Sequence, residues 1–172
     1  MVTLGPGARL YGMTFPPQMS DYRIEKIRCP VVVRTHSGDT VAGEIFLQPF
    51  VRPGGGDERP QDILNGRDPF FPLALADGDT LLLAKDQVLE VAIDRVDDVD
   101  DALEVLSRPM VVEIRLTSGD KRAGAIFLDM PSERPRLLDY LNREDERFLT
   151  LHGTERRFLI NRREIEHVRP LD

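Results

Sequence analysis

Residues 112–128 read Val-Glu-Ile-Arg-Leu-Thr-Ser-Gly-Asp-Lys-Arg-Ala-Gly-Ala-Ile-Phe-Leu, and this stretch decides the fold. It begins with alternating apolar and polar residues, which is typical of a half-buried strand. Ser118-Gly119-Asp120 follows as a turn, because glycine adopts positive φ at little cost. Gly124, Ile126 and Leu128 then share one face of a second strand. The stretch therefore predicts a β-hairpin, and its inward glycine predicts a bend or a close approach of another backbone segment.

The same pattern occurs earlier in the chain. Ser37-Gly38-Asp39 precedes Gly43, Ile45 and Leu47 at matching positions. The match continues downstream, where three segments return in order: Asp62-Ile63-Leu64-Asn65 as Asp139-Tyr140-Leu141-Asn142, Phe70 as Phe148, and 81–91 as 158–168. Order kept over about sixty residues indicates an internal duplication.

The duplication divides the chain into an N-terminal arm at 1–19, a first repeat at 20–94, an acidic linker at 95–101 and a second repeat at 102–172. We expect each repeat to begin with a short helix, at 21–27 and 102–106, that ends near Pro30 or Pro109. After the hairpin, each repeat has a short helix or turn ending in Leu-Asn. Three further strands are then expected per repeat, at 70–75, 80–84 and 88–93, and at 148–151, 157–160 and 165–168. The Pro/Gly-rich residues 49–60 are expected to form a mobile loop.

The composition restricts the class of protein. The chain has 172 residues, 23 basic and 30 acidic side chains, and a net charge of −7. Its single cysteine, Cys29, excludes a disulfide framework and a multi-cysteine zinc site. No apolar run approaches the roughly 18 residues of a membrane span, and no export signal is evident at the N-terminus. We expect a cytoplasmic protein that does not bind membranes.

One short helix and five short strands in about 70 residues indicate a small closed barrel, since closure removes exposed sheet edges. The repeats resemble the Sm-like family. Its glycine pair is matched by Gly38 with Gly43 and by Gly119 with Gly124, and its acidic–amide pair by Asp62 with Asn65 and Asp139 with Asn142. Its second motif is matched by 83–85 with Val88 and by 160–162 with Ile165, although Lys85 and Arg162 replace its glycine. We therefore expect a mainly β protein of two tandem five-stranded Sm-like barrels, each preceded by a short helix, with another SH3-like barrel as the alternative.

The resemblance implies RNA binding by loop amides and arginines. The matching candidates are Asn65, Asn142, Arg156, Arg157, Arg162 and Arg163. The acidic net charge disfavours RNA, and Glu155, Glu164 and Glu166 interleave with the arginines, so exposed strand faces of mixed charge are the alternative. Each asparagine is also a candidate C-cap, because asparagine tolerates the left-handed conformation.

No catalytic, metal or cofactor site is expected. His36, His152 and His167 are far apart in sequence, and Cys29 has no histidine at a matching position in its repeat. Arg143 and Arg147 have the spacing of a PilZ-type cyclic-dinucleotide motif, but the companion motif is missing, which leaves this a weaker alternative.

Self-association is the remaining class of function. Phe46 and Phe127 fall on the outward parity of equivalent strands, so they are candidate protein-interface residues, unless the chain's own helix or sister repeat covers them. We expect a non-enzymatic binding or scaffold protein whose partner is itself or another protein. The resemblance implies that three chains would form a six-barrel ring.

Overall fold

The computed structural model describes residues 25–94, 109–128, 137–142 and 145–171. The N-terminal arm and the acidic linker lie outside these residues. The first half contains five strands and one short α-helix: β1 (Ile27–Thr35), β2 (Thr40–Leu47), α1 (Pro60–Asn65), β3 (Phe70–Ala74), β4 (Thr80–Ala84) and β5 (Val88–Asp94), with the 3-10 turn η1 (Lys85–Gln87) between β4 and β5.

The second half repeats this order. Its elements are β6 (Pro109–Leu116), β7 (Lys121–Phe127), α3 (Leu137–Leu141), β8 (Phe148–His152), β9 (Arg156–Asn161), η2 (Arg162–Glu164) and β10 (Ile165–Pro170). The predicted hairpins, Leu-Asn helices and later strands are confirmed, with ends that differ by at most two residues. Equivalent turns also share hydrogen bonds: the His36 N–H donates to the Gln87 carbonyl at 2.8 Å and the Thr117 N–H to the Glu164 carbonyl at 2.9 Å.

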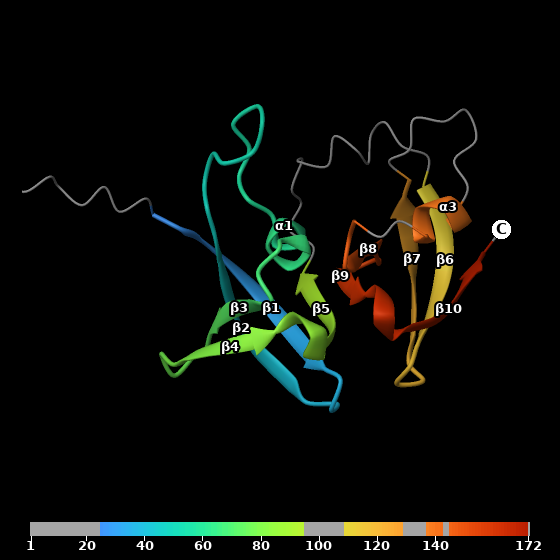
Figure 1. Ribbon diagram of the computed structural model, residues 1–172, viewed down its shortest axis with the longest axis horizontal. Helices are drawn as coiled ribbons and strands as arrows, with labels where there is room; N and C mark the ends of the chain where they lie inside the picture. Colours follow the sequence, from blue (N-terminus) through green and yellow to red (C-terminus); the bar gives the residue numbers. More distant parts are fainter. Residues whose placement is uncertain (1–24, 95–108, 129–136, 143–144, 172) are drawn as a thin grey trace, which may run out of the picture.

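All the described strands belong to one ten-stranded sheet with the order β10-β6-β7-β8-β9-β5-β1-β2-β3-β4, and every pair of neighbouring strands is antiparallel. The mainly β prediction is confirmed. The prediction of closed barrels is wrong, because the sheet is not closed and β4 and β10 remain as its edges. In Figure 1, β4 and β10 lie at opposite sides of the molecule, with β5 and β9 between them.

The expected helix at 21–27 is wrong at its C-terminal end. Ile27 is the first residue of β1, and Pro30 lies inside that strand opposite Glu44. Residues 25 and 26 are not helical either, while residues 21–24 of this helix, and the helix expected at 102–106, lie outside the described residues. Pro109 opens β6, where a proline is tolerated as the first residue of a strand.

The inward glycines permit close contact between strands, as predicted. A Cβ on Gly43 would lie 2.5 Å from the Ala74 carbonyl oxygen, and a Cβ on Gly124 would lie 2.5 Å from that of His152. Each glycine thus lets the strand after the Leu-Asn helix cross tightly over the hairpin.

Residues 48–58, the segment before α1, form hydrogen bonds with one another. The Gln48 N–H donates to Glu58 Oε2 and the Arg52 N–H to the Gly56 carbonyl, each at 2.9 Å. Gly54 and Gly55 supply the positive φ angles of the tight turn, so residues 48–58 form an ordered projection of the first half.

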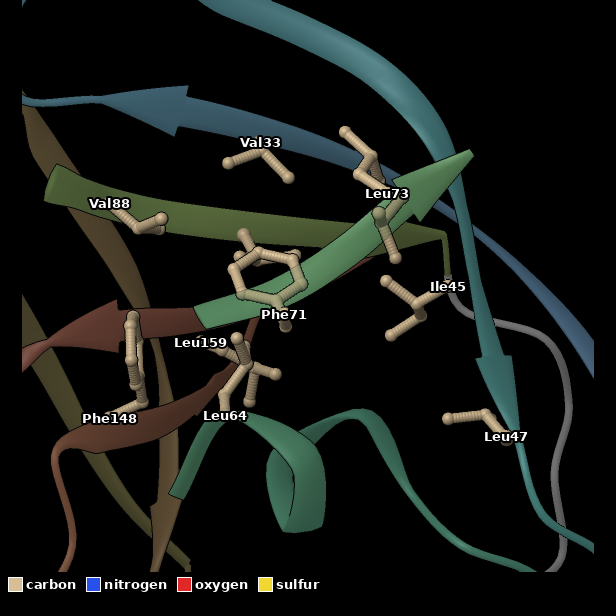
Figure 2. Packing of buried hydrophobic residues seen from close by; sticks show 11 residues of the cluster. Val33, Ile45, Leu47, Leu64, Phe71, Leu73, Val88, Phe148 and Leu159 are labelled. Carbon is tan, nitrogen blue, oxygen red and sulfur yellow. The ribbon is translucent and has the colours of Figure 1, made fainter. Parts of the chain in front are cut away.

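Two apolar clusters form the core, and each draws residues from both halves. Figure 2 shows Phe148 and Leu159 of the second half against Leu64 and Phe71 of the first. Leu89 of β5 belongs in turn to the cluster of the second half. This exchange joins the halves into one packed unit, since neither cluster is complete without the other half.

Candidate functional site

The junction between the halves is the antiparallel pair β5–β9, with Val91 opposite Leu159 and Glu90 opposite Ile160. The carboxylate of Glu90 is buried and accepts from two arginines, Arg34 at 3.3 Å and Arg122 at 2.5 and 2.9 Å. Arg34 belongs to the first half and Arg122 to the second. A buried carboxylate held by two guanidinium groups fixes the register of this pair.

Arg34 also joins β1 to the Ser-Gly-Asp turn of the second half. Its guanidinium donates to Asp120 and to Ser118 Oγ of the second half. The hydrogen bond from Arg34 lowers the pKa of the Asp120 carboxyl group, and the same contact raises the pKa of Arg34. This contact therefore connects the two halves beside the turn at residues 118–120.

Asn65 holds the junction at the other end. Its side chain accepts from the Phe148 N–H at 2.7 Å and donates to the Phe148 carbonyl at 3.3 Å. The C-cap interpretation is wrong for Asn65, because it is the last residue of α1 and Gly66 is the C-cap. Asn142 does follow the last residue of α3, and its N–H donates to the Leu138 carbonyl at 3.0 Å, but its φ is not positive. Asn65 instead joins α1 to β8, and the equivalent Asn142 is exposed immediately after α3.

Two equivalent cations satisfy the helix ends. Lys85 Nζ donates to the carbonyls of Ile63 at 2.5 Å and Gly66 at 3.0 Å, and Arg162 donates to those of Tyr140 and Leu141 at 3.3 and 3.0 Å. Burial, followed by the nearby charge of Arg147, lowers the pKa of Lys85. Lys85 and Arg162 occupy equivalent positions in the two repeats, where they cap the carbonyl groups at the helix ends.

Arg162 and the two asparagines border one cleft between the halves, of about 550 Å³. It brings together four of the six residues predicted for RNA binding, Asn65, Asn142, Arg162 and Arg163. Arg67 and Arg147 also line this cleft, and the RNA-binding prediction from the sequence did not include them. Asp145 and Glu146 also line the cleft, so its charge is mixed.

Arg156 and Arg157 do not reach this cleft. They lie at the opposite end of β9, where Arg156 Nε donates to Asp94 Oδ1 at 3.0 Å across the junction. The predicted arginine patch is therefore split in two. The cyclic-dinucleotide alternative needs Arg143, which lies outside the described residues, while Arg147 pairs with Asp86 at 3.5 Å.

The candidate interface aromatics are half-buried and already have neighbours. The guanidinium of Arg28 lies 5.6 Å from the centre of the Phe46 ring, and the Phe127 ring meets that of His152 edge-on at 4.8 Å. Neither ring stands alone on the surface, which makes them weaker candidates for an interface than the residues of the sheet edge.

The larger apolar surface lies along β4. Leu82 is 71% exposed and Phe70, on the neighbouring strand β3, is 55% exposed. Among the described strands, β4 pairs only with β3. The run Leu81-Leu82-Leu83 was the available signal in the sequence, because three consecutive leucines in an alternating strand place at least one on the outer face.

The histidines do not converge. His36 Nδ1 lies 3.1 Å from Glu164 Oε2, His152 packs on Phe127, and His167 lies on β10 beside Glu166. Cys29 is half-buried against the first apolar cluster. Within the described ranges, no group of three His, Cys, Asp or Glu side chains could hold a metal ion, and no helix is long and apolar enough to cross a membrane.

Comparison of the chain with protein-family models, with curated proteins and with solved structures gave no match.

Proposed function

We propose that this chain is a non-enzymatic scaffold of two Sm-like repeats, joined in one open sheet, that binds protein chains, including copies of itself, along the open edge of that sheet. The observation that carries the proposal is β4, an edge strand whose Leu82 and neighbouring Phe70 are both exposed. The shared strand order of the two halves and the paired glycines and asparagines support the tandem arrangement.

The backbone of β4 is ready to accept a strand. The Leu75 N–H donates to the Asp79 carbonyl, and hydrogen-bonded pairs alternate along an antiparallel ladder. Leu82 lies opposite Pro72, which has no N–H, so its own N–H and carbonyl point away from β3. An apolar, unpaired edge of this kind is a template for strand addition.

The test is sedimentation velocity of the full chain over a range of micromolar concentrations. The wild type is expected to associate, and Leu82→Lys to remain monomeric because a lysine charge at the edge opposes pairing. Val51→Lys is the matched control, since Val51 is also exposed but lies in the 48–58 projection. A wild type that stays monomeric, or a Leu82→Lys variant that associates as the wild type does, would contradict the proposal.

RNA binding at the cleft is the second candidate, favoured by the convergence of two asparagines and four arginines there. Asn65 and Arg162 already bond the protein's own backbone, and Arg147 and Arg163 share the carboxylate of Asp86 at 3.5 and 3.7 Å. Arg67 and the exposed Arg163, whose ion pair with Asp86 is a surface one, are therefore the cations most open to RNA. Charge-driven binding of a short single-stranded RNA should weaken steeply with salt and should be lost in Arg163→Ala with Arg67→Ala. Unchanged affinity in that double variant would exclude the cleft.

A further inference from the structure

We infer that Asn65-Gly66 is a site of spontaneous deamidation, and that opening of the junction between the two halves controls its rate. In an asparagine–glycine pair the glycine nitrogen attacks the asparagine side chain readily, because glycine has no side chain to obstruct the approach. Asn65 is the only one of the chain's three asparagines that precedes glycine, since Asn142 and Asn161 each precede arginine. The inference goes beyond the proposed function, because it concerns the junction and not the β4 edge.

The reaction is a cyclisation followed by hydrolysis. The Gly66 nitrogen loses its proton to hydroxide and attacks Cγ of Asn65. The Cγ–Nδ2 bond then breaks, ammonia leaves with a proton taken from water, and a five-membered succinimide remains. Water opens the succinimide at either carbonyl, which gives aspartate or isoaspartate at position 65. The net change is water in and ammonia out, and no electrons are transferred.

In the folded chain both reacting groups are engaged in hydrogen bonds. The Gly66 N–H donates to the Ile63 carbonyl at 3.2 Å, and Lys85 Nζ donates to the Gly66 carbonyl at 3.0 Å. The side chain of Asn65 accepts from the Phe148 N–H at 2.7 Å and donates to the Phe148 carbonyl at 3.3 Å. The reaction therefore requires Asn65 to leave Phe148 first, which is a local opening of the junction.

Water reaches the dipeptide even while the junction is closed. Asn65 and Gly66 line the cleft between the halves, and Gly66 is exposed. The hydrogen bonds, and not burial, therefore protect the site. A Cβ at position 66 would lie 3.2 Å from the carbonyl oxygens of Asp62 and Ile63, so the end of α1 favours glycine there and keeps the reactive pair in the sequence.

The modification prevents the junction from closing as before. A carboxylate only accepts hydrogen bonds, so it cannot donate to the Phe148 carbonyl, and isoaspartate also adds a methylene to the backbone. Arg67 and Arg163 line the same cleft and attract the new negative charge away from Phe148. Opening of the junction is thereby converted into a lasting change, and the fraction of modified chains records how long the junction has been open.

Mass spectrometry of peptides from the full chain measures the rate, as replacement of the Asn65 amide by an acid. The wild type is incubated at mildly alkaline pH, folded and, in parallel, unfolded in guanidinium chloride. The folded protein is expected to convert at least tenfold more slowly, the ratio that corresponds to about 1.4 kcal/mol of opening free energy. The peptides of Asn142 and Asn161 are internal controls and should convert slowly in both samples, because an arginine follows each.

Two variants test the coupling to the junction without altering the dipeptide. Glu90→Gln removes the buried charge that Arg34 and Arg122 share, and it should speed conversion of the folded chain about fivefold or more. Glu44→Gln breaks only an exposed ion pair and should leave the rate unchanged. Thermal unfolding checks that both variants are folded. The comparison of folded with unfolded wild type needs no variant, so it decides the protection of Asn65 even if Glu90→Gln does not fold.

Asn65→Asp reproduces the aspartate product and tests the consequence of the reaction. It should unfold at a lower urea concentration than the wild type, with Asn142→Asp at the exposed equivalent position as the control. Equal conversion in folded and unfolded wild type, or equal rates in folded Glu90→Gln and Glu44→Gln, would overturn the inference. An Asn65→Asp protein as stable as the wild type would overturn the claim that modification keeps the junction from closing.

Discussion

Asn65 and Phe148 are 83 residues apart in sequence, yet the amide of Asn65 bonds both the N–H and the carbonyl of Phe148, at 2.7 and 3.3 Å. Phe148 is fully buried, so while the amide is in place it is the partner that shields these two backbone groups from water. The contact places α1 of the first half on β8 of the second. A single side chain therefore connects the two halves at this point.

Asn65→Ala should therefore reduce the free energy of unfolding by about 2–4 kcal/mol, because two buried backbone groups lose their partners. Urea unfolding of dilute protein measures the change. Asn142→Ala is the matched control, and its exposed position predicts a change within about 0.5 kcal/mol under the same dilute conditions. Equal effects of the two substitutions would show that Asn65 does not hold the halves together.

Glu90→Gln should reduce the free energy of unfolding by about 1–3 kcal/mol, because Arg34 and Arg122 would face a neutral amide in a buried position. Chemical denaturation measures it, with Glu44→Gln as the control. Glu44 pairs with Arg28 at 3.1 Å, but that pair is exposed, so its loss should cost about 0.5 kcal/mol or less. A larger cost at Glu44 than at Glu90 would contradict the role of the buried carboxylate.

Gly43→Ala should destabilise the protein by about 2–4 kcal/mol, since the new Cβ would lie 2.5 Å from the Ala74 carbonyl oxygen. Gly38→Ala provides the contrast. Gly38 has φ +93° but open space around it, so its substitution should cost about 1 kcal/mol from backbone strain alone. Thermal and urea unfolding of both variants distinguish steric overlap from strain, and a Gly43→Ala protein as stable as the wild type would show that β2 and β3 are not in close contact.

The Arg34–Asp120 contact should make stability depend on acid pH. Because the pKa of Asp120 is lowered in the folded chain, its contribution is fully present above the unfolded value of about 3.9 and is lost as the pH falls through the folded pKa. Asp120→Asn should therefore be less stable than the wild type at neutral pH, with the difference shrinking below about pH 4. A difference that does not change between neutral and strongly acid pH would show that the charge of Asp120 contributes nothing.

Local patterns predicted the strands well, because the evidence for a strand or turn lies within a few residues. The alternation around Ile114 and the repeated Ser-Gly-Asp turns are of this kind. The close contacts at Gly43 and Gly124 followed for the same reason, since only glycine fits where two strands cross so tightly.

The closure of the sheet could not be predicted in this way. Leu82 and Leu159 occupy equivalent positions in the repeat, and no local difference shows that β5 covers one while the other stands at an edge. The same holds for Asn65 and Asn142, whose neighbours in sequence are similar and whose partners come from distant segments. These features depend on the strand pairing between the two halves. The sequence of a single repeat carries no information about that pairing.

The claim on which the account depends is that Leu82 lies in a strand ladder when the chain is concentrated and at a bare edge when it is dilute. Amide hydrogen exchange of the full chain at low and high concentration measures this directly. The account predicts that the amide of Leu82 exchanges freely in dilute protein and becomes protected on concentration. Exchange at Leu82 that stays fast while the protein associates would contradict it.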